Sequence, residues 1–269
     1  MLDQRVGFIG AGQMATALGK GLIKARLVAP EQLCASDPAE AARSQFAQAT
    51  SAATFAENKA VVQQADILFL AVKPRYSATV AAEIAGQLGP EHLVVSLAAG
   101  VRLATLQKSL GAQTRLIRVM PNTPCLVGKG ACGFCLGKTA KPADGELVGR
   151  LLGAVGVAYR VQEDLLDAVT GLAGSGPAFV YTVIEALSDG GVQMGLPRSI
   201  ATALAAHTVL GAAQMVLDTG EHTGVLRDRV ASPGGTTIAG IQALEECGLR
   251  TALMAAVEAA TERSIELGN

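Results

Sequence analysis

Two glycine-rich turns, one near each end of the chain, have residue types that could bind an anion. The first is GFIGAGQMA (7–15) and the second is SPGGTTIAG (232–240). Glycine lets the backbone approach a ligand closely, and the free N–H groups at the start of a helix attract negative charge. Only the second turn also carries hydroxyl groups. The sequence therefore predicts two anion sites of different kinds.

The first turn has the spacing of a dinucleotide-binding fingerprint. Gly10-x-Gly12-x-x-Ala15 directly follows a strand-like run, residues 5–9, and opens a helical stretch. Gly10 would make the tight turn, Gly12 would admit the pyrophosphate, and Ala15 would let helix and strand pack closely. The cofactor-binding residues predicted in this turn are Gly10, Ala11, Gly12, Gln13 and Met14.

The end of the second strand bears on the choice between two cofactors. Asp37 stands 22 residues beyond Ala15, where a carboxylate can accept hydrogen bonds from both ribose hydroxyls and would repel a 2′-phosphate. This position favours NAD. Ser36 and Asn58 donating to a 2′-phosphate, with Arg43 nearby, would favour NADP instead. The sequence leaves both open.

Two further strands end in small residues at the predicted carboxyl edge of the sheet. They are LAVKP (70–74) and SLAAG (96–100), and ligands of open α/β sheets bind at this edge. Small side chains there leave room for a nicotinamide ring, although ordinary strand-to-helix turns would have the same composition. The predicted cofactor residues are Ala71, Val72, Lys73, Pro74, Ala98, Ala99 and Gly100.

The chain lacks the usual proton donors of a carbonyl reductase. No Tyr-x-x-x-Lys pair occurs, none of the three histidines has a carboxylate orienter in sequence, and residues 171–187 contain no lysine. A protonated imine carries its own positive charge, so it fits this inventory better than a ketone. Ser232–Thr237 precedes an apolar helical pattern and is a candidate carboxylate receptor; the alternative is a Ser/Thr-capped helix start without a ligand.

These residues need a sheet and helices to position them. Alternating apolar runs and helical stretches predict an α/β Rossmann-type dinucleotide-binding domain over 1–161, and long Ala-rich helices predict an all-α dimerisation domain over 162–269. The predicted strands are 5–9, 32–36, 66–72, 92–98, 115–120, 130–136 and 155–161. The predicted helices are 14–25, 38–49, 76–88, 103–110, 142–153, 177–193, 197–217 and 249–267.

Composition favours a small-molecule ligand. Half of the residues are apolar, only 3% are aromatic and the formal net charge is −1, which gives no electrostatic footprint for nucleic acid or an anionic membrane. Ser199–Leu217 is uncharged over the length of a membrane span, but its polar residues argue for a helix buried in protein. Cys132 and Cys135 form an isolated CxxC with no nearby histidine, so no metal is expected. We expect a cytoplasmic protein with reduced thiols.

Several separate motifs resemble those of the pyrroline-5-carboxylate reductases. They are VGFIGAGQMA, FLAVKP, VMPNTP, DAVTGLAGSGPAF, DGGVQMGLP and, most specifically, SPGGTTIAG, and they span nearly all 269 residues. The resemblance implies reduction of L-1-pyrroline-5-carboxylate to L-proline with NADP or NAD as cofactor. A β-hydroxyacid dehydrogenase or other imine reductase on the same scaffold, and a non-catalytic dinucleotide sensor, are the alternatives.

The resemblance also implies site residues and an assembly. The loop would hold the substrate through Ser232, Gly234, Gly235, Thr236 and Thr237, with Thr237 placed to hydrogen-bond the amine. Glu163 matches a position near the substrate, and Asn58 and Asn122 are included among the cofactor-binding positions. The implied assembly is a homodimer, with a decamer built from dimers as a larger form, in which the loop of one subunit completes its neighbour's site. Asp37 departs from the Ser of some NADP-preferring relatives.

Overall fold

The computed structural model of the protein describes residues 1–268 and divides into two compact units. The first consists of Met1–Ser175 and the end of the chain from Glu258, and the second is Gly176–Val257. The sequence predicts a domain boundary at residue 161, which is where the strand-forming region ends and not where the compact units divide. That boundary between the two functional domains stays a prediction.

A single sheet of eight strands forms the first unit. The strands are β1 (Val6–Ile9), β2 (Leu33–Ser36), β3 (Ala53–Phe55), β4 (Ile67–Leu70), β5 (Leu93–Ser96), β6 (Arg115–Met120), β7 (Gly130–Leu136) and β8 (Gly156–Arg160). Their order is β3-β2-β1-β4-β5-β6-β7-β8, and all neighbours are parallel except β6 and β7. The chain leaves β1 toward one side and returns at β4 on the other, which is the arrangement that binds ligands at the carboxyl ends of these two strands.

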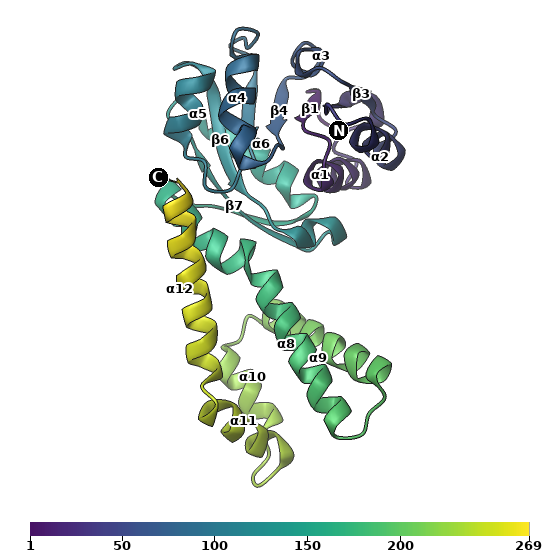
Figure 1. Cartoon of the computed structure of the whole chain (residues 1–269), viewed down its shortest axis with the longest axis vertical. Coiled ribbons are helices and arrows are strands. Elements are labelled where there is room, and N and C mark those ends of the chain that lie inside the picture. Colours follow the sequence, from purple (N-terminus) through teal and green to yellow (C-terminus); the bar gives the residue numbers. More distant parts are fainter. Residues whose placement is uncertain (269) are drawn as a thin grey trace. The chain divides into compact units, whose positions relative to one another are not determined.

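Helices cover both faces of this sheet (Figure 1). One face packs against α1 (Gln13–Lys24), α2 (Glu40–Thr50) and α6 (Pro142–Gly153), and the other against α3 (Asn58–Val62), α4 (Pro74–Ala85) and α5 (Leu103–Leu110). Shorter turns are η1 (Pro30–Gln32), η2 (Thr123–Val127), η3 (Glu163–Leu165), α7 (Leu166–Val169) and the π-helical turn η4 (Thr170–Gly174). The predicted α/β Rossmann-type class is confirmed.

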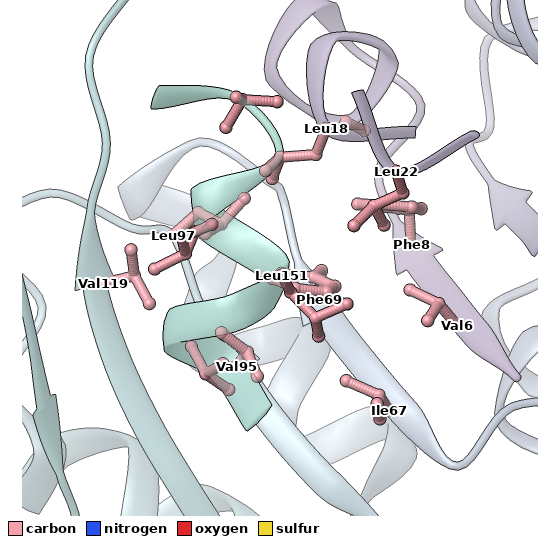
Figure 2. Packing of buried hydrophobic residues seen from close by; sticks show 14 of the residues in the cluster. Val6, Phe8, Leu18, Leu22, Ile67, Phe69, Val95, Leu97, Val119 and Leu151 are labelled. Atoms are coloured by element: carbon pink, nitrogen blue, oxygen red, sulfur yellow. The ribbon is translucent and has the colours of Figure 1, made fainter. Parts of the chain in front are cut away.

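A buried cluster fixes the two strands that end at the predicted site. Phe8 of β1 stacks on Phe69 of β4 with ring centroids 5.1 Å apart, and Leu18 and Leu22 of α1 cover them (Figure 2). Such an aromatic pair contributes about 0.5–1.5 kcal/mol beyond the burial of its surface. The carboxyl ends of β1 and β4 are therefore held firmly relative to each other and to α1.

The structure differs from the predicted elements at the sheet edge and at a proline. The short strand β3 and helix α3 were not predicted, because three or five residues, partly exposed, give no clear apolar run. Pro74 was expected to stop a strand reaching Val72. The strand ends at Leu70 instead, and Pro74 occupies the first helical position of α4, where its missing N–H costs nothing.

The second unit is helical. Its helices are α8 (Gly176–Gln193), α9 (Arg198–Thr219), α10 (Thr223–Val230), α11 (Thr236–Glu246) and the start of α12 (Leu249–Gly268). Many large apolar side chains on them are exposed in the single chain, among them Leu187, Leu210 and Leu217. By length and composition alone, α9 also meets the criterion for a membrane span. Such apolar faces are typical of helices that are covered by another subunit.

Candidate functional site

The first glycine-rich turn joins β1 to α1 at the carboxyl edge of the sheet. Gly10 has a φ of +98°, and a Cβ there would lie 2.7 Å from the carbonyl oxygen of Ala71, so only glycine fits without strain. The backbone of Gly12 is ordinary (φ −76°), and no heavy atom of the described chain, apart from its chain neighbours, lies within 4 Å of a Cβ built on it. The space beside Gly12 is therefore open to a ligand, next to the free N–H groups of the first turn of α1.

Two cavities, of about 870 and about 240 Å³, lie along this edge of the sheet. Predicted cofactor residues line both, and Ala71–Lys73 are shared. Those in the larger cavity are Gly10, Gly12, Asp37, Asn58, Ala71, Val72 and Lys73, and those in the smaller are Met14, Ala71, Val72, Lys73 and Ala99. The arrangement suits an elongated ligand with two bulky ends, as a dinucleotide is.

Part of the wall of the larger cavity was not predicted from the sequence. Helix α4 contributes Arg75, Tyr76 and Glu83, and the guanidinium of Arg75 lies 4.7 Å from the centre of the Tyr76 ring. Glu57 and Lys59 flank Asn58 in the same wall. The sequence contained a signal for this wall, because a proline soon after a strand, here Pro74, favours the start of a helix and so places its first turns at the sheet edge.

Asp37 is fixed at the end of β2 by two backbone donors. Its Oδ2 accepts a hydrogen bond from the N–H of Ala11 at 3.0 Å, and its Oδ1 accepts one from the N–H of Ala39 at 2.9 Å. Ala11 is itself buried and belongs to the first glycine-rich turn. The carboxylate therefore forms part of the cavity wall in a single orientation, beside the first glycine-rich turn.

Ser36 and Asn58 form a hydrogen-bonded chain that ends at Glu83. The hydroxyl of Ser36 donates to Oδ1 of Asn58 at 2.8 Å, and Nδ2 of Asn58 donates to Oε2 of Glu83 at 3.0 Å. Ser36 is fully buried, so it does not line the cavity, whereas Asn58 and Glu83 do. The arrangement brings together two predicted residues and one that the sequence analysis missed.

The turn after β5 lies against the end of the chain. Gly100 has a φ of +74°, and a Cβ on it would be 3.7 Å from Cβ of Leu267 in α12. Pro74, Ala99 and Gly100 line a separate cavity of about 510 Å³, whose wall also contains Arg263. Ala98 is buried below this surface, and Gln13 is exposed at the start of α1.

Asn122 has protein partners for its amide. Its Oδ1 accepts from the N–H of Ala131 at 3.0 Å, and its Nδ2 donates to the carbonyl of Ala173 at 3.0 Å. The side chain is buried and ties β7 to the π-helical turn η4. It does not line either cofactor cavity. A structural role explains these contacts, and cofactor binding by Asn122 stays a prediction.

Glu163 is the first residue of η3, and its side chain contacts the start of α5. Its Oε1 accepts from the N–H of Leu103 at 2.6 Å and from the guanidinium of Arg118 at 3.3 Å. Arg118 is buried and also pairs with Asp167, which accepts a hydrogen bond from Ser264 at 2.7 Å. A carboxylate at a helix N-terminus satisfies free N–H groups and the helix dipole. The structure gives Glu163 a positioning part in this network, and a direct catalytic role stays a prediction.

The second glycine-rich turn opens α11 in the second unit. Gly234 has a φ of +65°, and a Cβ on Gly235 would collide with the hydroxyl of Ser232. Gly235 precedes Thr236, the first residue of the helix, and no side chain caps that end. The side-chain cap of the alternative reading is therefore not formed, and the first N–H groups of α11 are free for a ligand, whose binding there stays a prediction.

The five cysteines are free thiols, and two of them, Cys132 and Cys135, lie on β7. The Sγ atoms of Cys125 and Cys132 are 3.9 Å apart, and this contact lowers the pKa of Cys125 to about 7 and raises that of Cys132. Burial raises the pKa of Cys135 to about 11. Among residues 1–268 no group of three or more His, Cys, Asp or Glu side chains could hold a metal ion.

Known proteins match the whole chain. The sequence model described as pyrroline-5-carboxylate reductase dimerisation matches residues 163–267, and one described as NADP oxidoreductase, coenzyme F420-dependent, matches residues 5–100. A pyrroline-5-carboxylate reductase of Methanosarcina acetivorans is 48% identical over 268 residues, which cover 100% of this chain and 99% of the relative.

Solved structures agree with this match. The structure of a pyrroline-5-carboxylate reductase from Coxiella burnetii has a TM-score of 0.94 at 36% identity, and each chain is covered completely. The pyrroline carboxylate reductase from Plasmodium falciparum, with NADP bound, has a TM-score of 0.89 at 33% identity, also with complete coverage of both chains.

Proposed function

The chain belongs to the pyrroline-5-carboxylate reductase family, and from this premise we propose that its two glycine-rich turns hold the two reactants. The enzyme reduces L-1-pyrroline-5-carboxylate to L-proline by hydride transfer from NAD(P)H, the final step of proline biosynthesis. Family membership sets aside the keto-acid dehydrogenase and the non-catalytic dinucleotide sensor as alternatives.

The cavity along β1 and β4 fits NAD(P)H. The open space at Gly12 and the first turn of α1 suit the pyrophosphate, and Asp37 and Asn58 suit the adenosine ribose. Met14 and Ala99, in the smaller cavity, suit the nicotinamide end. When bound, the reduced nicotinamide supplies the hydride, and the residues of this edge orient it.

The uncapped start of α11 is the single observation that carries the substrate assignment. Its free N–H groups and the hydroxyls of Ser232 and Thr236 hold the carboxylate, with Gly234 and Gly235 shaping the turn, and the hydroxyl of Thr237 hydrogen-bonds the ring nitrogen. The protonated imine carries its own positive charge. Hydride addition to the imine carbon places the C=N electron pair on nitrogen and yields the neutral amine, so catalysis depends on positioning rather than on a strong acid.

The dimerisation match and the exposed apolar helices indicate an oligomer. In our proposal the face of α9 is covered by another subunit rather than by lipid, and the loop of one subunit completes the site of its partner. Dimers assemble further into a decamer. A formal net charge of −1 and five free thiols support a cytoplasmic enzyme that binds neither nucleic acid nor membrane.

Replacement of Thr237 tests the substrate site. Thr237→Ala removes one hydroxyl that acts on the reacting nitrogen, so kcat/KM for pyrroline-5-carboxylate should fall by about 10-fold or more. The Kd for the cofactor should not change, because the cofactor residues belong to the other unit. Thr251→Ala, at an exposed position of α12, is the matched control. Unchanged steady-state kinetics in Thr237→Ala would remove this residue from the mechanism.

A further inference from the structure

The adenosine end of the cofactor cavity bears on whether NADH or NADPH is preferred. The sequence leaves two sets of residues in competition there. Asp37 would accept from the ribose hydroxyls of NADH, whereas Ser36, Asn58 and Arg43 could donate to the 2′-phosphate of NADPH. The hydrogen bonds in the structure distinguish between the sets, because they show which donors are already used.

The side chains of Ser36 and Asn58 are engaged by protein acceptors. The carboxylate of Glu83 only accepts, so the contact at 3.0 Å must be a donation from Nδ2 of Asn58. Oδ1 of Asn58 then faces the hydroxyl of Ser36 at 2.8 Å, and Ser36 must donate its proton to it. Ser36 therefore has no proton left for a phosphate, and the amide of Asn58 is held beside a negative charge.

One guanidinium nitrogen of Arg43 is also engaged. This nitrogen, NH1, donates to the carbonyl of Asp37 at 2.7 Å and to that of Pro38 at 3.0 Å. These bonds shape the turn after β2 and direct that end of the guanidinium to the backbone. Lys59, which follows Asn58, also lines the cavity, but it is exposed, so solvent and salt screen its charge.

Among the charged residues that line this cavity, Asp37 is the one that is partly buried. The Asp37 carboxylate is locked by the N–H groups of Ala11 and Ala39, and each of its oxygens retains a lone pair for a ribose hydroxyl. The other charged residues of this wall are all exposed, so solvent and salt screen them: Glu57, Glu83, Lys59, Lys73 and Arg75. A 2′-phosphate would add about two negative charges close to the Asp37 carboxylate. The two hydroxyls of a free ribose would instead donate hydrogen bonds to that carboxylate.

We propose that Asp37 makes NADH the preferred cofactor, and that Glu83 is a positioning residue that reinforces the preference by holding Asn58. This inference rests on the proposed placement of the dinucleotide along β1 and β4. The preference belongs to the cofactor-binding unit alone, so it is measurable without substrate.

The test measures the Kd of NADH and of NADPH by titration calorimetry on the full-length protein, together with kcat/KM for each. The unmodified enzyme should bind NADH about 10-fold or more tightly than NADPH, because the Asp37 carboxylate repels the 2′-phosphate. Asp37→Ser should shift the ratio toward NADPH by roughly 30-fold or more. Added salt should narrow the gap in the unmodified protein.

Two variants separate the contributions. Glu83→Gln keeps a hydrogen bond to Asn58 but removes the charge, so the Kd of NADPH should fall about 3-fold while that of NADH stays constant. A merely structural role of Glu83 would move both constants together. Asp3→Ser, at an exposed position of the same unit, should leave the ratio unchanged.

The outcomes distinguish this inference from the proposed function. Tighter binding of NADPH than NADH by the unmodified protein, or an unchanged ratio in Asp37→Ser, would overturn the cofactor preference while leaving the reductase assignment intact. Binding of neither cofactor would instead contradict the placement of the dinucleotide.

Discussion

Gly12→Ala separates the functional from the structural part of the first glycine-rich turn. The backbone of Gly12 has a φ of −76°, which alanine adopts without strain, and a Cβ there would meet no heavy atom of the described chain within 4 Å beyond its chain neighbours. The residue also lines the cofactor cavity. We therefore expect the added methyl group to occupy ligand space and to leave the folded protein otherwise unchanged.

The expected magnitude follows from the bonds that the methyl group would displace. If the pyrophosphate withdraws from the start of α1, at least one charge-assisted hydrogen bond is lost, which costs about 1.5–3 kcal/mol. This corresponds to a rise of about 10- to 150-fold in the Kd of NAD(P)H. Two opposing effects act on the free energy of unfolding. Alanine is a poorer helix N-cap than glycine, which lowers it, but alanine also restricts the unfolded chain, which raises it. The net change should be within about 0.5 kcal/mol.

Calorimetric titration with NADH and thermal unfolding without ligand measure the two effects separately. Gly86→Ala is the matched control, because Gly86 also has a compatible φ of −69° and open surroundings but does not line the cavity. Gly10→Ala should instead lower the melting temperature, since its Cβ would lie 2.7 Å from a backbone oxygen. Unchanged cofactor affinity in Gly12→Ala would refute the placement of the pyrophosphate.

Two further predictions concern buried polar groups. Asp167→Ala removes a buried partner of Arg118 and should lower the free energy of unfolding by about 3 kcal/mol. Asp164→Ala breaks an exposed ion pair and should lower it by less than about 0.5 kcal/mol. Urea titrations at one protein concentration measure both values, and equal effects would contradict this prediction. Burial raises the pKa of Cys34 from 9.0 to about 11, so the unfolded chain loses this proton first and stability should fall between pH 9 and 11. Iodoacetamide at pH 8 should label Cys34 in urea but not in the folded protein, and rapid labelling of the folded protein would show that the thiol is accessible.

Much of the fold could be predicted because its strands are short, fully buried apolar runs. β1, β4 and β5 are buried along their whole length, so each gives an uninterrupted signal between polar helices. The antiparallel direction of β7 was also predictable in principle. Only residues 121–129 separate it from β6, and a parallel crossover needs a dozen residues or more.

Side-chain direction at the site was less predictable. A motif marks where Asn122 and Glu163 lie along the chain but not which groups their side chains meet. Asn122 bonds to the π-helical turn η4 and Glu163 to the start of α5, and both partners come from distant segments. Local pattern contains no information about these contacts. The same reason explains why Glu83 was missed, because its importance comes from Asn58 across the cavity wall.

The two glycine-rich turns, which we propose bind two different anions, share one local geometry. In each, one glycine takes a positive φ that other residues rarely adopt, Gly10 in the first and Gly234 in the second. The following glycine of each motif leaves space, but for different occupants: Gly12 for a ligand, and Gly235 for the hydroxyl of Ser232. A helix then begins with free N–H groups in both cases. The first turn thus offers backbone donors suited to a pyrophosphate, whereas the second adds a hydroxyl directly at the helix start, which suits a smaller acid whose orientation must be fixed for reaction.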